Sequence, residues 1–272
     1  MKRGATIACA VALAAALAGV AWLCLGSYGP SYQGKSLIVW MNEWDRYLSA
    51  NQGSPERAKR DQAQAAINQI GTHALPTLLR MAGAKDSALK KRFIALARKQ
   101  SLVRFHLHPA DYYHAKATYG FGALGSAAKP AVPALIGLLH DKDPEVRASA
   151  AQCLSLIGPE ATDAVPALIQ TLNAEGNGYG PVLINSMLAL GAVHSEPETV
   201  VPVLLEYVNG PRKDWNYSVP AMDALGRYRE RARSAVPAIL PYLNHADSDK
   251  RQAADVALCA IDAQAAARAQ KK

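Results

Sequence analysis

Apolar residues recur with helical spacing through most of the chain. Four segments place apolar side chains at positions i, i+3, i+4 and i+7, which is one face of a helix. These sets are Val132, Leu135, Ile136 and Leu139; Val165, Leu168, Ile169 and Leu172; Val201, Leu204, Leu205 and Val208; and Val236, Ile239, Leu240 and Leu243. A proline follows the first member of each set. The pattern predicts four short helices with proline in the opening turn, where a missing N–H does no harm.

A further helix is predicted before each of these, as the first helix of a hairpin. Aligned glycines stand at its end: Gly71, Gly125, Gly158, Gly191 and Gly226. One residue before each glycine is aliphatic, and the residue four before it is large and apolar. The residue five before it is always small: Ala66, Gly120, Cys153, Ser186 and Ala221. The small column lets a neighbouring helix approach closely, and the glycine is expected to supply the positive φ that ends the helix.

The aligned prolines define a repeat. Their spacings are 57, 33, 36 and 35 residues, so a unit has about 35 residues and the first interval carries an insertion. One hairpin cannot bury both of its faces, so neighbouring units must stack. The sequence predicts an all-α stack of about five to six hairpins over residues 59–265. It also predicts a helical insertion at about 84–112 and a polar tail at 266–272.

The run "ALGSAAKPAVPALIGLLHDKDPEVRASAAQCLSLIGPEATDAVPALIQTL" resembles tandem HEAT repeats of the short, PBS-lyase-type bacterial kind. It shares the proline in the second helix and the Asp-Pro-x-Val-Arg motif at the start of the next first helix. The resemblance covers about residues 60–265 and is strongest at 115–172. It implies a right-handed α-solenoid, whose usual work is to bind proteins. It implies no reaction.

The first 30 residues differ from the rest. Lys2 and Arg3 precede an uncharged apolar run over residues 5–25, which is long enough to cross a bilayer of about 30 Å. Because a signal-peptide core is usually about 7–15 residues, an uncleaved membrane anchor is favoured over a cleaved signal. The basic flank stays in the cytoplasm. We therefore expect the body in the periplasm, anchored at the inner membrane or released after signal cleavage.

Residues 31–58 are interpreted as an N-terminal capping helix and a loop. Ser36 can cap an amphipathic helix that carries Leu37, Trp40, Trp44 and Leu48. An open end of a solenoid needs such a cover. The alternative is an interfacial helix that lies on the membrane beside the anchor.

The positive charge is concentrated in one segment. Without Lys2 and Arg3 the chain carries 28 basic and 22 acidic residues, or +6. Residues 85–104 alone also carry +6, with seven basic residues and Asp86. The basic patch is Lys90, Lys91, Arg92, Arg98, Lys99 and Arg104. It is either a solvated helix face or a contact for an acidic protein or an anionic lipid surface. Nucleic acid is disfavoured, because the basic residues do not recur from repeat to repeat.

Catalytic and metal motifs are sparse. The segment "HLHPADYYH" could bring His106, His108, Asp111 and His114 to a metal, or it is a plain surface loop. The sequence contains no nucleophile elbow, phosphate loop or dinucleotide fingerprint. Cys153 and Cys259 are interpreted as buried free thiols, with a disulfide as the alternative. No catalytic residue, metal or cofactor is therefore predicted.

Protein binding remains as the predicted function. The loops "NAEGNGYG" and "NGPRKDWNY" carry aromatic and arginine residues that are typical interface anchors. They are Tyr179, Arg212, Trp215 and Tyr217, although Trp215 and Tyr217 could instead pack back onto their own repeat. The sequence predicts a monomeric, non-catalytic adaptor for an unknown protein partner, tethered at the outer face of the inner membrane. The alternatives are a metal-handling enzyme using residues 106–114 and a binder of anionic surfaces through residues 85–104.

Overall fold

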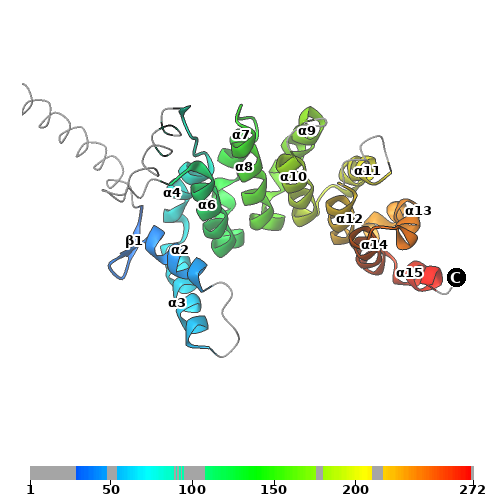
Figure 1. Cartoon of the computed structure of the whole chain (residues 1–272), viewed down its shortest axis with the longest axis horizontal. Coiled ribbons are helices and arrows are strands. Elements are labelled where there is room, and N and C mark those ends of the chain that lie inside the picture. The colour runs from blue at the N-terminus through cyan, green and yellow to red at the C-terminus, as the bar shows by residue number, and fades with distance from the viewer. Residues whose placement is uncertain are drawn as a thin grey trace, which may run out of the picture. The chain divides into compact units, whose positions relative to one another are not determined.

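The computed structural model of the 272-residue chain is helical almost throughout the part that it describes (Figure 1). That part comprises residues 29–47, 54–88, 90, 92, 94, 108–175, 180–209 and 217–270. The expected membrane segment at residues 5–25 lies outside the described residues. The chain divides into two compact units, residues 1–77 and 78–272, and each is described by itself.

The first unit is a small helical module with a β-hairpin. Strands β1 (Ser31–Tyr32) and β2 (Lys35–Ser36) pair antiparallel, and helices α2 (Leu37–Arg46) and α3 (Pro55–Ile70) follow. The apolar face of α2 packs on α3, with Leu37, Trp40 and Met41 buried. The indole N–H of Trp40 donates to the Tyr32 carbonyl at 3.0 Å, which fixes the hairpin on the helix. Ser36 takes the N-cap position of α2, but its hydroxyl makes no capping hydrogen bond, contrary to expectation.

The second unit is a series of helical hairpins. A 3₁₀ turn η1 (Gly71–Ala74) and helix α4 (Leu75–Ala82) carry the chain into it. The first helices of the hairpins are α6 (Ala110–Leu124), α8 (Pro144–Ile157), α10 (Gly180–Val193), α12 (Ser218–Arg227) and α14 (Ser248–Ile261). The second helices are α7 (Val132–Leu138), α9 (Val165–Glu175), α11 (Pro197–Val208), α13 (Val236–Ile239) with η6 (Leu240–Asn244), and α15 (Ala263–Gln270). The turns η2 (Gly125–Ala131), η3 (Gly158–Ala164) and η5 (Arg229–Ala235) join three of these pairs.

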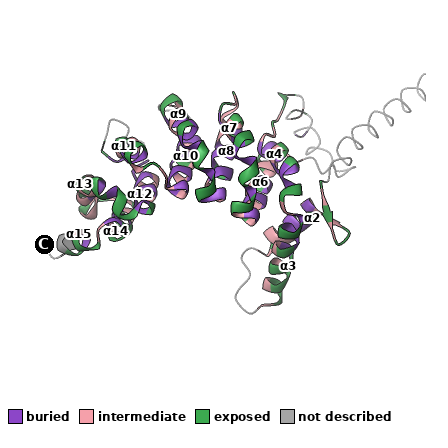
Figure 2. Ribbon diagram, turned by 180° about the vertical axis from the view of Figure 1, so that it is seen from behind, coloured by how far each residue is buried: buried purple, intermediate pink, exposed green. Residues whose placement is uncertain are grey.

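The hairpins stack in chain order. Helix α6 packs on α8, α8 on α10, α10 on α12, and α12 on α14. Buried residues follow these contacts, as Figure 2 shows for α8, α10 and α12. The predicted columns form this core: the small residues are buried, and Phe121, Leu154, Met187 and Met222 are 0% exposed. The predicted all-α stack of hairpins is therefore confirmed for the described part of the second unit.

The glycine column serves two purposes, and only one was predicted. Gly125 and Gly158 have φ values of +51° and +73° and end their helices, as expected. Gly191 and Gly226 instead lie inside α10 and α12. A Cβ atom on Gly191 would lie 2.7 Å from the Cα of Ala224 in the next first helix. The prediction of a helix end was thus wrong there, because the glycine is needed for close packing between hairpins.

The start of α11 also differs from the prediction. Pro202 was placed in an opening turn, but α11 begins at Pro197 and Pro202 lies within the helix. Pro197 occupies the first turn of α11 instead, where the fixed φ of proline is favourable. Pro202 therefore removes one main-chain hydrogen bond from the helix interior.

One described segment is apolar enough to cross a membrane by length and composition alone. It covers Ala110–Leu138, with a mean hydropathy of 1.3. The segment is not one continuous rod, since Gly125 ends α6 and the turn η2 leads into α7. Phe121, Leu124 and Leu135 on its two helices are buried in the hairpin stack. A third of its most apolar 18-residue window is buried, so packing in the solenoid accounts for part of its apolar character.

Candidate protein-binding surfaces

The predicted aromatic anchors lie mostly outside the described residues. This holds for Tyr179, Arg212 and Trp215. Tyr217 is described and is only 6% exposed. Its ring packs edge-to-face on Tyr207 at 6.2 Å between ring centroids. Tyr217 therefore packs onto α11 of the preceding hairpin, and its ring is not an exposed anchor.

Only Lys90 and Arg92 of the basic patch are described; Lys91, Arg98, Lys99 and Arg104 lie outside. The Lys90 ammonium pairs with the Asp86 carboxylate at 2.6 Å and lies 5.5 Å from the centre of the Tyr113 ring. Asp86 also accepts the Ala110 N–H at 3.0 Å, at the start of α6. The lysine is thus engaged in fixing this segment on α6, whereas Arg92 is exposed.

The described histidines of the candidate metal loop point to different partners. His114 Nε2 lies 2.9 Å from the Ala84 carbonyl oxygen, and the His108 ring stacks on Tyr112 at 3.7 Å. The Asp111 carboxylate accepts the Tyr112 N–H. His106 lies outside the described residues. Within the described part of the chain, no three His, Cys, Asp or Glu side chains are placed to share a metal ion.

The two cysteines are free, but their environments differ. Cys153 is 0% exposed, and burial raises the pKa of its thiol to about 12. At neutral pH it is therefore a protonated packing residue, not a nucleophile. Cys259 is exposed on α14, so the prediction that it is buried was wrong. The two residues before it, Ala257 and Leu258, are buried.

A repeated Asp–Arg pair organises the links between hairpins. The Asp143 carboxylate caps α8 by accepting the Glu145 N–H at 3.0 Å. Asp247 caps α14 in the same way, accepting from Asp249 at 2.8 Å. Four residues later, Arg147 donates to the carbonyls of the preceding turn, and Arg251 does the same in the last hairpin. The second pair was missed in the sequence, since it lacks the proline and valine of the motif.

Tyrosines tie consecutive second helices together. The buried Tyr207 hydroxyl of α11 donates to the Leu172 carbonyl of α9 at 3.1 Å. One repeat later, the Tyr242 hydroxyl of η6 donates to the Val208 carbonyl of α11 at 2.5 Å. Each bond engages a main-chain carbonyl among the last four residues of its helix. These tyrosines are 35 residues apart, which is one repeat.

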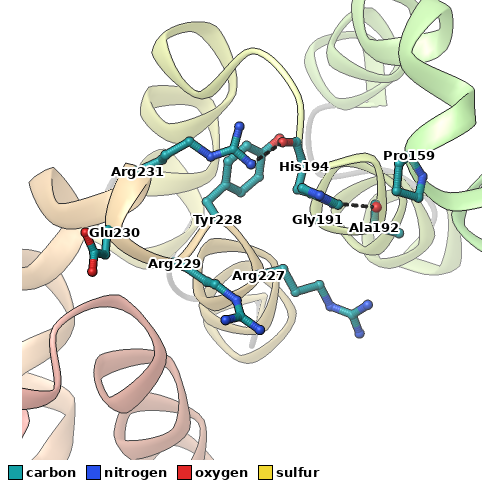
Figure 3. Close-up of a pocket in the computed structure, with 9 residues that line it drawn as sticks. All are labelled: Pro159, Gly191, Ala192, His194, Arg227, Tyr228, Arg229, Glu230 and Arg231. Carbon is teal, nitrogen blue, oxygen red and sulfur yellow. Dashed lines mark hydrogen bonds between the residues drawn. The ribbon is translucent and has the colours of Figure 1, made fainter.

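A groove of about 640 Å³ opens where the end of α10 meets the turn after α12 (Figure 3). Its lining comprises Pro159, Gly191, Ala192, His194, Arg227, Tyr228, Arg229, Glu230 and Arg231. Three arginines therefore face one hollow on the edge of the solenoid. The total charge does not reveal this site, because its basic residues balance acidic ones elsewhere in the chain. The signal that could have found it is the local run "RYRERAR" at 227–233.

A smaller hollow of about 340 Å³ lies on the links between hairpins, beside Arg147. The Arg147 Nε donates to Glu175 Oε1 at 2.6 Å, and His140 Nε2 lies 3.2 Å from Gln170 Oε1. Main-chain N–H of Asp143 and the Lys85 ammonium hold the pKa of the Asp141 carboxyl below its usual value. These polar groups are paired with each other, so the hollow is a structural network.

Comparison with protein families gives one match, over part of the hairpin stack. The family model for HEAT repeats matches residues 106–179. A search of curated proteins found no match. Among solved structures, the crystal structure of an engineered protein from a structural genomics consortium is 18% identical with a TM-score of 0.46, over 82% of this chain and 97% of the other. A second such engineered protein is 19% identical with a TM-score of 0.42, over 82% and 68%. Residues 106–179 therefore match the HEAT-repeat family, and the described part of the second unit is a stack of helical hairpins.

Proposed function

We propose that this chain is a non-catalytic scaffold that binds another protein. The observation that carries the proposal is the stack of HEAT-like hairpins itself. HEAT repeats generally mediate protein–protein interaction. Stacking leaves two long edges of turns and an exposed row of second-helix positions, such as Gln170 and Glu206. Such a repeated, extended surface suits the recognition of another macromolecule.

The chemistry of the described side chains supports binding over catalysis. Ionisable groups with a shifted pKa are engaged in structure: Asp141 and Asp247 by main-chain N–H groups, and Cys153 by burial. Burial likewise raises the pKa of the Tyr228 hydroxyl, which donates to two main-chain carbonyls. An active site would combine such shifts with a nucleophile and a base within hydrogen-bond reach. The described residues supply no such combination around these groups.

A second part of the proposal concerns where in the cell the scaffold acts. The apolar run at residues 5–25, with Lys2 and Arg3 before it, would tether the body at the outer face of the inner membrane. A scaffold held there would concentrate its partner at the membrane surface. If the leader is cleaved, the same body would act as a free periplasmic protein.

Capture of the partner tests the scaffold function. Membranes that contain the full chain with a tag after Lys272 are cross-linked, and the captured proteins are identified by mass spectrometry. The control is the same tag on residues 1–30 alone, which reports proteins that merely lie near the leader. We expect at least one protein to be enriched reproducibly with the full chain and not with the control. Enrichment of no such protein would contradict the proposal.

The exposed thiol of Cys259 tests the location separately. A maleimide that does not cross the inner membrane is added to cells with a permeabilised outer membrane. Labelling is expected for a chain that carries Cys9→Ser and Cys24→Ser, and it is expected to disappear when Cys259→Ser is added, because Cys153 is buried. Labelling only after lysis of the inner membrane would place the body in the cytoplasm and contradict the proposed location. Size on a denaturing gel, against a chain that begins at residue 31, shows whether the leader is retained.

A further inference from the structure

The groove between the end of α10 and the turn η5 has the chemistry of an anion site. We propose that it binds an acidic segment of the partner protein, through the carboxylates of its Asp and Glu side chains. This inference rests on the proposed scaffold function and names the partner chemistry that one surface of the scaffold would select.

Positive charge dominates the lining. The lining carries three arginines, Arg227, Arg229 and Arg231, and one glutamate, Glu230, a local charge of +2. Arg229 is exposed and makes no hydrogen bond or ion pair with the described residues. Arg227 is half-exposed and is paired with Asp223 only through an exposed contact at 3.2 Å. Glu230, the one acidic lining residue, pairs with Arg233 and is drawn pointing away from Arg227 in Figure 3. Both guanidinium groups therefore remain able to receive carboxylates, which they bind in a bidentate manner.

The support beneath these arginines is fixed in place. Tyr228 is 1% exposed, and its hydroxyl donates to the carbonyls of Leu190 at 3.0 Å and Ser195 at 2.8 Å. Arg231 donates to the His194 carbonyl at 2.7 Å, and its guanidinium lies 5.7 Å from the centre of the Tyr228 ring. These contacts join η5 to the end of α10. A ligand would thus meet a preformed hollow, with little ordering of the protein on binding.

Backbone geometry sets this place apart from the other turns. At Gly125 and Gly158 the chain leaves the first helix with a glycine of positive φ. Here the positive φ values fall on His194 and Arg229 instead, at +39° and +53°. Residues other than glycine rarely adopt such values, and they concentrate at functional sites. Both of these residues line the groove.

The neighbouring turn favours a short acidic peptide over a long polyanion. Turn η3 supplies Pro159 to the groove and continues with Glu160 and Asp163, which are both exposed. A nucleic-acid backbone or a flat anionic membrane that covered this edge would also meet these carboxylates. A few acidic side chains that enter the hollow would avoid them. The concave lining and the alternation of charge therefore point to a local acidic segment of a protein.

Binding of a defined peptide tests the proposal. The probe is fluorescein-labelled octaglutamate, and its anisotropy is measured with the purified full chain in a non-ionic detergent at low ionic strength. Saturable binding is expected, with octaglutamine as the uncharged control. The double variant Arg227→Gln/Arg229→Gln is expected to bind about tenfold more weakly, and Arg229→Gln alone about threefold, since each guanidinium forms a charge-assisted contact. Binding should weaken as salt is raised.

A matched control comes from the same segment. Arg233 is exposed and does not line the groove, so Arg233→Gln changes the net charge equally and is expected to alter binding less than twofold. Thermal unfolding of each variant shows whether the fold is retained, and Arg229→Gln breaks no hydrogen bond or ion pair with the described residues. Equal weakening by Arg229→Gln and Arg233→Gln would overturn the proposal, as would no saturable binding by the wild-type chain. Tighter groove-dependent binding of octathymidylate or phosphatidylglycerol vesicles would also overturn it.

The two proposals can fail separately. If partners are captured equally by the wild type and the Arg227→Gln/Arg229→Gln variant, and octaglutamate binding does not depend on these arginines, the groove proposal fails and the scaffold stands. If octaglutamate binds through the groove but no partner is captured with the full chain, the scaffold proposal fails and the anion site stands.

Discussion

The Arg147 guanidinium joins the first turn of α8 to the Glu175 carboxylate in the last turn of α9. The same guanidinium donates to the carbonyls of Asp141 and Lys142 in the link before α8. One side chain therefore fixes a link between hairpins and both ends of the hairpin that follows. Arg251 repeats the contacts with the link in the last hairpin. Arginines at this position in the repeat are consequently structural, whereas those at 227 and 229 are exposed at a groove.

Replacement of Arg147 should destabilise the solenoid. In Arg147→Ala the Glu175 carboxylate, whose side chain is 9% exposed, loses its partner, and two turn carbonyls lose a donor. We expect the free energy of unfolding to fall by about 2–3 kcal/mol, because a nearly buried charge is left unpaired. Urea unfolding followed by circular dichroism measures the loss. The control is Lys129→Ala, which removes an exposed ion pair with Glu160 and should leave the unfolding midpoint unchanged.

Substitution by alanine should have opposite effects on stability at two helical glycines, Gly191 and Gly137. A Cβ atom at Gly191 would lie 2.7 Å from the Ala224 Cα, so α10 and α12 would have to separate. Gly191→Ala is expected to cost about 1–3 kcal/mol of unfolding free energy. Gly137 of α7 has no atom within 4 Å of such a Cβ, so Gly137→Ala should be neutral or stabilise by up to about 1 kcal/mol. Thermal unfolding of both variants checks this, and equal midpoints would contradict the packing role of Gly191.

The repeat and its core could be predicted because the same physical requirement recurs in every hairpin. Five aligned small residues and five large ones identify the packing face, and their burial follows from it. The fate of each glycine could not be predicted from the column alone. Gly158 and Gly191 occupy the same register, yet one ends a helix and the other lies inside one. The choice depends on the distance between neighbouring helices, which the sequence does not state.

The candidate binding site was not predictable in the same way. Arg227, Arg229 and Arg231 are close in sequence, but the groove also needs Pro159 and Gly191 from two preceding hairpins. A total charge cannot reveal such a site, since exposed acidic residues elsewhere cancel it. Lys90 shows, conversely, that a basic stretch of sequence need not form a free basic surface. It belongs to the most basic segment of the sequence, and yet the structure pairs it with Asp86 and the Tyr113 ring.

The contribution of each tyrosine hydroxyl between second helices to stability can be measured by replacing the tyrosine with phenylalanine. Tyr207→Phe removes the hydroxyl that donates to the Leu172 carbonyl and leaves the buried ring in place. We expect a loss of about 1 kcal/mol in unfolding free energy, the usual value of one buried hydrogen bond. Tyr217→Phe is the matched control, because this neighbouring ring is also buried and its hydroxyl makes no hydrogen bond with the described residues. Equal effects of the two substitutions in urea unfolding would show that the Tyr207 hydroxyl contributes nothing specific.

Acid should destabilise the last hairpin through Asp247. The N–H groups of Asp249 and Lys250 donate to its carboxylate at 2.8 and 3.4 Å, and they lower its pKa from the usual 3.8. The unfolded chain therefore binds this proton more readily than the native one, and native stability falls as pH drops below about 4. Asp247→Asn keeps an oxygen that can cap α14 but cannot titrate, so its stability should fall less between pH 5 and pH 2. Asp247→Ala should be less stable than Asp247→Asn at every pH, because it lacks the cap. Thermal midpoints across this range test both statements, and parallel curves for the wild type and Asp247→Asn would contradict a titrating cap.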